Sequence, residues 1–176
     1  MITEKSDNNI FNREAMFRGT MLGVFWILMS AIYMMGLNTP ILSYLFLAMF
    51  VASPFYAGYM VVNYRKRECN DKMTFVKAWL FLIIMYICAS LLSAIVQYIY
   101  LVYIDNGFLF GFIQEQLDFL LNEPTIDDIT KETLKQVSEM WSNITVKDIV
   151  IQILSSNIML TGIITPVTAL FVKKNK

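Results

Sequence analysis

The sequence contains no histidine, and its two cysteines, Cys69 and Cys88, are 19 positions apart. A helical rise of about 1.5 Å per residue keeps such a pair well beyond disulfide distance. Two thiols without an imidazole also make no metal site. A glycine-rich phosphate loop is missing as well. These absences argue against metalloenzymes, histidine-dependent intramembrane proteases and nucleotide-binding proteins, so we expect no catalytic residue, no bound metal and no cofactor.

Charge is also scarce, since charged residues make up 16% of the chain against 57% apolar residues, with a mean hydropathy of +0.55. A soluble domain is nearer a quarter charged. Asp, Glu, Lys and Arg are absent from four blocks, residues 19–37, 41–64, 78–104 and 149–172. A bilayer core of about 30 Å requires roughly 20 apolar residues in a helix. The blocks therefore predict an all-α membrane protein with a bundle of four transmembrane helices.

The charges that remain are distributed unevenly between the blocks. Eleven Lys and Arg residues lie before the first block, between the second and third, and after the fourth, whereas residues 105–148 hold three lysines and nine acids. Lys and Arg near span ends favour the cytoplasmic side. We therefore expect both termini in the cytoplasm. The predicted organisation is a cytoplasmic tail 1–15, a membrane domain 16–172 with a cytoplasmic loop 65–77 and an extracytoplasmic insert 105–148, and a cytoplasmic tail 173–176.

The cytoplasmic loop carries a candidate basic patch. A docking surface for anionic lipid headgroups is one interpretation, because each cation near such a surface contributes about 1 kcal/mol. A topology signal with no further role is the other. The patch consists of Arg65, Lys66, Arg67, Lys72 and Lys77.

The insert shows helical periodicity on either side of Pro124. Apolar residues at helical spacing predict two short amphipathic helices. The motifs "TIDD" and "TVKD" predict capping boxes that begin at Thr125 and Thr145. The first apolar stripe is Leu109, Ile113, Leu117 and Leu120, and the second is Ile126, Ile129, Val137, Met140 and Ile144. Interfacial helices that seek anionic lipid are usually basic, so these acidic helices are expected to pack on the bundle or on a partner.

Uncharged polar residues form a stripe on the fourth block, and the third block adds a glutamine. The stripe is either a polar path through the bundle or a set of interhelical hydrogen bonds. We also predict that Gln97 faces the fourth span and bonds near Asn157 or Ser156, since an unpaired amide in hydrocarbon costs several kcal/mol. The residues are Asn157, Thr161, Thr165, Thr168 and Gln97.

Small residues spaced four apart on the first two blocks predict close helix contacts, either within one chain or between chains. They are Gly19 and Gly23 in the first block and Ala48 and Ala52 in the second.

The basic stretch "NYRKREC", the following "MTFVKAW" that leads into the third block, and the long polar insert before the fourth resemble a family of small bacterial inner-membrane proteins, domain of unknown function 4199. The resemblance covers nearly the whole chain. It implies a multi-pass protein of a bacterial inner membrane, and it implies no activity or catalytic residue.

These features favour a non-enzymatic subunit or accessory factor that acts through protein contacts. The expected partners are the lipid bilayer and either a membrane protein or further copies of this chain, with no nucleic acid. The alternative is a small carrier or channel for a neutral or weakly polar solute that uses the stripe of the fourth block. No charged group lies within the blocks, whereas proton-coupled carriers usually need one at depth.

Overall fold

A computed structural model describes residues 2–37 and 39–174, with side chains from residue 9 onward. This part of the chain is all-α and contains six helices. They are α1 (Ile2–Gly36), α2 (Pro40–Glu68), α3 (Phe75–Tyr103), α4 (Phe108–Asn122), α5 (Asp128–Asn143) and α6 (Val146–Val172). The chain divides into two compact units. Unit 1 comprises residues 1–96 and 153–176, and unit 2 comprises residues 97–152.

Four helices are long and apolar enough to cross a membrane, which confirms the four predicted spans. Their bounds are Asn9–Gly36, Pro40–Glu68, Phe75–Tyr103 and Val146–Val172. Helices α1, α3 and α6 begin before the corresponding charge-free block, because a charged residue near a helix end can keep its charge in water. Helix α2 begins one residue before its block, at the uncharged Pro40. Helix α1 begins at Ile2, so residues 2–15 of the segment expected as a cytoplasmic tail, residues 1–15, continue the first span as helix.

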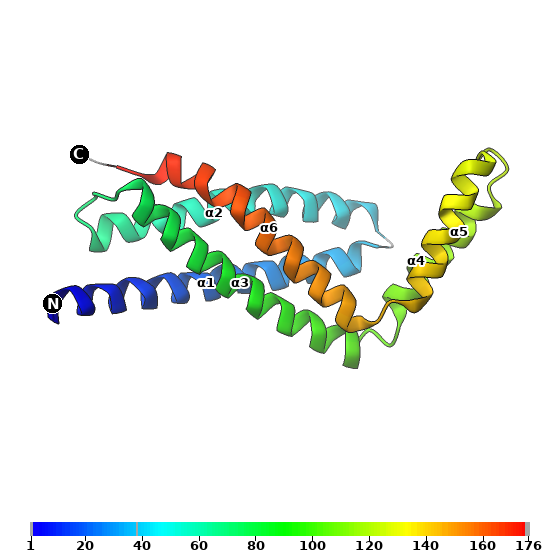
Figure 1. Ribbon diagram of the computed structural model, residues 1–176, viewed down its shortest axis with the longest axis horizontal. Helices are drawn as coiled ribbons and strands as arrows, with labels where there is room; N and C mark the ends of the chain where they lie inside the picture. Colours follow the sequence, from blue (N-terminus) through cyan, green and yellow to red (C-terminus); the bar gives the residue numbers. More distant parts are fainter. Residues whose placement is uncertain (1, 38, 175–176) are drawn as a thin grey trace. The chain divides into compact units, whose positions relative to one another are not determined.

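The core of unit 1 forms where α1, α2, the first part of α3 and the last part of α6 pack together (Figure 1). Its largest fully buried side chains include Phe81, Leu22, Leu82 and Met85. Large apolar side chains elsewhere on the same helices stay exposed, with Phe55 at 75%. Helices that are apolar on all sides are typical of membrane spans, whose outer faces contact lipid.

The two ends of unit 1 differ in their connections. At one end α1 and α2 are joined by a short turn, where the Ser43 hydroxyl donates to the Gly36 carbonyl at 3.1 Å. The start of α1, the loop between α2 and α3, and the end of α6 lie together at the other end (Figure 1). Outside residues 105–148, the lysines and arginines that the structure describes are therefore in segments that meet at that end.

Unit 2 contains the hairpin of α4 and α5, which confirms the two short helices predicted between the third and fourth spans. Gln114 Nε2 donates to Ser138 Oγ at 3.0 Å, and Trp141 Nε1 donates to the Phe110 carbonyl at 3.4 Å. The Phe110 and Trp141 rings also pack with centroids 5.4 Å apart. These contacts use only one side of α5, and none of its residues is buried.

One of the two predicted capping boxes is correct and the other is displaced. Thr145 and Asp148 cap α6 reciprocally, because Thr145 N donates to Asp148 Oδ2 at 2.9 Å and Asp148 N donates to Thr145 Oγ1 at 3.3 Å. The predicted cap at Thr125 is wrong, since that hydroxyl donates to Glu123 instead. The N-cap of α5 is Asp127, which accepts from Thr130 N and from its hydroxyl. The Thr130 hydroxyl, followed by its backbone N–H, lowers the pKa of Asp127.

Candidate functional site

The loop between α2 and α3 holds a compact group of polar contacts, which we call the clasp and define as Arg65, Asp71 and Lys174 together with the Val172 carbonyl. The clasp depends on a sharp reversal after α2, where Asn70 and Asp71 adopt φ angles of 49° and 57°. Asn and Asp are the non-glycine residues that most readily adopt this left-handed conformation. The Arg65 carbonyl accepts from Cys69 N and Asp71 N, both at 3.1 Å, so the reversal brings Asp71 back to Arg65.

Side-chain bonds in the clasp join α2 to the end of α6. Arg65 Nε donates to Asp71 Oδ1 at 2.9 Å, and Arg65 Nη1 donates to the Val172 carbonyl. Lys174 Nζ donates to the other carboxylate oxygen of Asp71. Arg65 thereby satisfies one of the carbonyls at the α6 C-terminus that has no partner within the helix.

A backbone pair lies beside these side chains. Met73 N donates to the Lys174 carbonyl at 2.8 Å, and Lys174 N donates to the Met73 carbonyl at 2.9 Å. This antiparallel bridge aligns the segment before α3 with the segment after α6. Two loops that are about a hundred positions apart in sequence therefore form one surface.

The clasp divides the predicted basic patch into one buried, hydrogen-bonded cation and four exposed ones. Arg65 is buried at 8% exposure, and its guanidinium is engaged by a carboxylate and a carbonyl. The hydrogen bond from Lys174, followed by the bond from Arg65, lowers the pKa of Asp71. The other predicted patch residues, Lys66, Arg67, Lys72 and Lys77, are exposed. Sequence reasoning missed Asp71 and Lys174. The available signal was an acid that directly follows an asparagine in a cationic loop, Asp71 after Asn70.

Aromatic rings form a cluster that includes Tyr64, the residue directly before Arg65 of the clasp. Tyr64 and Phe81 stack with centroids 4.5 Å apart, and Phe11 meets Phe81 edge-on at 5.3 Å. The Arg18 guanidinium lies 5.6 Å from the centre of the Tyr64 ring and pairs with Glu14 at 3.2 Å. The cluster packs α1 against α2 and α3 at this end of unit 1.

The polar stripe of α6 is directed partly into the helix packing. Thr161 and Thr165 are buried, and their hydroxyls donate to the carbonyls of Asn157 and Thr161, each at 2.7 Å. Thr165 Oγ1 also accepts from Trp79 Nε1 at 3.1 Å. Thr168 is half-buried on the same face. These bonds occupy hydroxyls that a solute path would need, and transport along the stripe stays a prediction.

Tryptophan N–H groups are bonded within unit 1, which sequence reasoning did not anticipate. Trp26 Nε1 donates to Ser53 Oγ at 2.8 Å and joins α1 to α2. Trp79 joins α3 to α6 through Thr165.

Gln97 belongs to unit 2 and Asn157 to unit 1, and the pairing of these two amides stays a prediction.

The small residues fall into two classes. Gly19 and Gly23 are buried against α3, where a Cβ built at Gly19 would lie 2.6 Å from the Met85 carbonyl oxygen and 2.8 Å from Cys88 Cβ. Ala48 and Ala52 are exposed on α2. The glycines therefore serve a contact within the chain.

The α4–α5 hairpin presents an apolar stripe to its surroundings. We define the α5 stripe as Ile129, Val137 and Met140, which are 81%, 43% and 67% exposed. They lie on one arc of the helix, at spacings of eight and three residues. Glu132 and Glu139 are exposed on the neighbouring arc. The stripe was predicted from periodicity, but its exposure was not.

Metal chemistry has no visible basis in the part of the chain that the structure describes. There, no group of three or more His, Cys, Asp or Glu side chains is arranged to hold a metal ion.

Comparison with protein families matches residues 18–174 to one family, described as a protein of unknown function, DUF4199. The matched segment contains the clasp, the polar stripe and the α4–α5 hairpin. This chain belongs to the DUF4199 family. Curated proteins and solved structures give no match.

Membership of DUF4199 confirms the resemblance drawn from the basic stretch and the insert. It brings no assigned activity to these residues, because the family description is of unknown function. What this DUF4199 chain does must therefore be inferred from its own surfaces. The described residues form two candidate binding surfaces, the cationic end of unit 1 and the α5 stripe of unit 2.

Proposed function

We propose that this protein is a non-enzymatic subunit or accessory factor of a membrane complex and that it binds a partner protein through the α5 stripe. The observation that carries the proposal is the exposure of Ile129 and Met140 on a helix that is too charged to lie in a bilayer core. Helix α5 contains Asp128, Lys131, Glu132, Lys135 and Glu139, and one charge at a span centre costs about 3 kcal/mol. Contiguous apolar surface outside the membrane is typical of protein interfaces.

The charge around the α5 stripe indicates which chemistry the surface of the partner must have. Residues 105–148 hold nine acids and three lysines. A partner with an apolar centre and a basic rim complements this surface, since opposite potentials across an interface favour encounter and fix its register. An anionic bilayer surface would be repelled by the same acids. The proposed partner is therefore a protein with exposed Leu, Ile or Phe side chains surrounded by Lys or Arg.

A non-enzymatic role is supported by the composition and bonding of the spans. The sequence has no histidine, and the buried hydroxyls of Thr161 and Thr165 donate within their own helix. Neither hydroxyl lies beside a general base that would activate it as a nucleophile.

Photocrosslinking in native membranes tests the proposal. A photoreactive amino acid replaces Thr133, which lies on the arc of the α5 stripe, or Ser142 as a control on another arc. We expect one discrete protein adduct from position 133 and none from position 142. The adduct should disappear in Ile129→Ser/Val137→Ser/Met140→Ser and weaken in Glu132→Lys/Glu139→Lys. Lipid adducts alone, or a product of twice the chain mass, would contradict the proposal.

We further propose that both termini face the cytoplasm of a bacterial cell with the protein in its inner membrane, so that the α4–α5 hairpin lies on the opposite side. The uneven distribution of Lys and Arg supports this topology. In a Cys69→Ser/Cys88→Ser background, Glu132→Cys should react with an impermeant thiol reagent in intact spheroplasts. Lys72→Cys should react only after the membrane is opened. The reverse pattern would overturn the assignment.

A further inference from the structure

The clasp leaves a set of exposed cations at its end of unit 1, which we call the basic rim and define as Lys66, Arg67, Lys72, Lys77 and Lys173. All five side chains are exposed. The salt bridges among the described residues join Arg18 to Glu14 and join Arg65 and Lys174 to Asp71. The basic rim takes part in none of them, so no described carboxylate neutralises its charge, although Lys77 Nζ lies 5.8 Å from the centre of the Phe11 ring.

Among the side chains that the structure describes, acids at this end compensate the basic rim only weakly. Asp71 is the one acid between Cys69 and Ala78, and both of its oxygens accept bonds in the clasp. Glu14 is paired with Arg18. Glu68 is left as an exposed carboxylate next to Arg67. The surface therefore attracts an anion.

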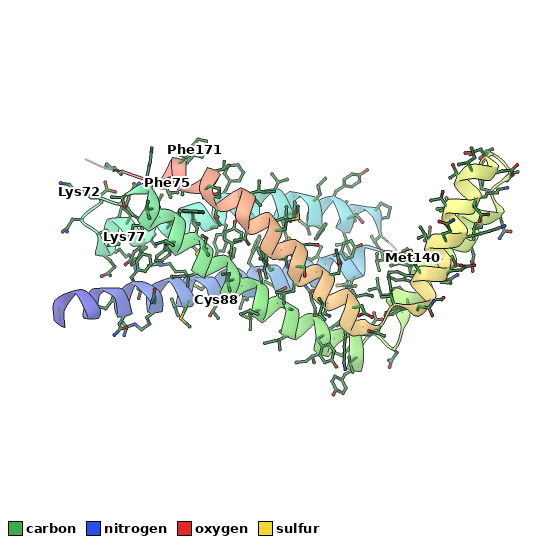
Figure 2. The ribbon with its side chains drawn as sticks, viewed as in Figure 1. Lys72, Phe75, Lys77, Cys88, Met140 and Phe171 are labelled. Atoms are coloured by element: carbon green, nitrogen blue, oxygen red, sulfur yellow. The ribbon has the colours of Figure 1, made fainter. Side chains whose placement is uncertain are left out.

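The backbone bridge determines which side chains share this surface. Because Met73 pairs with Lys174 in antiparallel register, Thr74 lies beside Lys173, and the start of α3 lies beside the end of α6. Figure 2 shows Lys72, Phe75, Lys77 and Phe171 at this one end of unit 1. The sequence alone predicts that Lys173 is on the same side of the membrane as the basic loop, but it does not place Lys173 or Phe171 beside the loop, since about a hundred residues separate them.

Exposed apolar groups lie next to these cations. Phe171 is 83% exposed and Val76 is 57% exposed, and both lie on helices with the length and composition of membrane spans. A free phosphate would gain nothing from the Phe171 ring. A phospholipid offers an anionic headgroup for the lysines and an acyl chain for the phenyl ring.

We propose that the basic rim binds anionic phospholipid, with the headgroup phosphate held by Lys72, Lys173 and their neighbouring cations and an acyl chain against Phe171. The clasp takes part indirectly, because it neutralises Asp71 and fixes the loop that carries Lys72. Binding through the basic rim is independent of any partner at the α5 stripe.

Binding of defined lipids to the purified full chain in neutral detergent tests the inference. Phosphatidylglycerol and phosphatidylcholine with identical acyl chains are compared by native mass spectrometry. We expect phosphatidylglycerol to bind at least tenfold more tightly. Removal of one cation, as in Lys72→Gln, should weaken its binding about fivefold, as estimated from about 1 kcal/mol per cation. Lys66→Gln/Arg67→Gln/Lys72→Gln/Lys173→Gln should abolish the preference between the two lipids.

Matched variants test whether lipid binding depends on the cations of the basic rim or on positive charge anywhere in the chain. Lys131→Gln/Lys135→Gln/Lys147→Gln removes the three lysines of residues 105–148 and should leave phosphatidylglycerol binding unchanged. Phe171→Ser should weaken binding of both lipids, because it removes an acyl contact. Inorganic phosphate at the same concentration as the lipid should not compete with phosphatidylglycerol for binding. Equal binding of the two lipids, equal losses in the two lysine variants, or full competition by phosphate would each overturn the inference.

Discussion

Units 1 and 2 both expose large apolar side chains, but the exposure has different physical meanings. Phe55 of α2 and Ile129 of α5 are 75% and 81% exposed. Phe55 lies on a stretch without charges, where lipid tails are the natural neighbour, whereas Ile129 lies on a helix with five charged residues. The comparison shows that exposed apolar area indicates a missing protein partner only when the composition of its helix excludes the bilayer.

The units also differ in how their helices are held. Unit 1 is held by close backbone approach at Gly19, by a buried indole hydrogen bond from Trp26 and by a partly buried one from Trp79. The α4–α5 hairpin is held by one amide–hydroxyl bond, one indole–carbonyl bond and one aromatic pair. Substitutions in unit 1 should therefore cost more stability than substitutions on the outer arc of α5.

The largest effect is expected for Gly19→Ala. The added Cβ would lie 2.6 Å from the Met85 carbonyl oxygen, so α1 and α3 must separate, at a cost of about 2 kcal/mol. The control is Gly162→Ala, since a Cβ there has no neighbour within 4 Å. It should be neutral or gain up to about 1 kcal/mol from helix propensity. Thermal unfolding in detergent measures both, and equal responses would refute the α1–α3 contact.

A smaller effect is expected for Thr165→Val. The valine keeps the shape of the buried side chain but removes the oxygen that accepts from Trp79. The loss should be about 1 kcal/mol, as for hydrogen bonds between membrane helices. The Trp79 indole N–H resonance should shift, whereas Thr168→Val should leave it in place. An unchanged resonance in Thr165→Val would show that the bond is absent.

Acid should weaken the clasp. The folded-state pKa of Asp71 lies below its usual 3.8, so the unfolded chain takes up the proton first as the pH falls. The stabilisation is fully present above that usual value and is lost as the pH falls through the lower folded pKa. The melting temperature of the native chain should thus fall more between pH 5 and pH 3 than that of Asp71→Asn. The exposed neighbour Glu68→Gln serves as control and should keep the native profile.

The smallest effect on stability is expected for Ile129→Ser/Val137→Ser/Met140→Ser, the variant that should abolish partner binding. These side chains are exposed, and such substitutions usually change stability by about 0.5 kcal/mol or less. Leu117→Ser, at a buried site of α4, should loosen the hairpin. Hydrogen exchange of the α5 amides compares the two. A triple variant that exchanges as fast as Leu117→Ser would mean that the α5 stripe is part of the fold.

Much of the fold was predictable because the bilayer imposes a strong pattern. Blocks 78–104 and 149–172 differ from α3 and α6 by only a few residues at each end. Helix caps were predictable only in part. The Thr145–Asp148 box lies directly before a long apolar helix and needs no outside partner. Thr125 follows Pro124 and bonds back to Glu123, which leaves the cap of α5 to Asp127.

The site was less predictable, because its contacts are distant in sequence. Composition placed five cations in one loop, but it did not show that Arg65 turns inward to the Val172 carbonyl. Periodicity placed Thr161 and Thr165 on one face of the fourth span, but the indole that bonds Thr165 comes from α3. Pairwise geometry of this kind follows from tertiary packing, which a single sequence does not display.

The separation of the clasp residues has a consequence for biosynthesis. Arg65 is 107 positions from Val172, and Asp71 is 103 positions from Lys174. The loop therefore leaves the ribosome long before its binding site on α6 exists, and Arg65 stays hydrated until α6 has been inserted. Burial of this guanidinium then marks the completion of the helix bundle. A chain stalled before α6 would display Arg65 without the carbonyl that covers it in the complete bundle, so the exposure of this one guanidinium distinguishes an unfinished chain from a finished one.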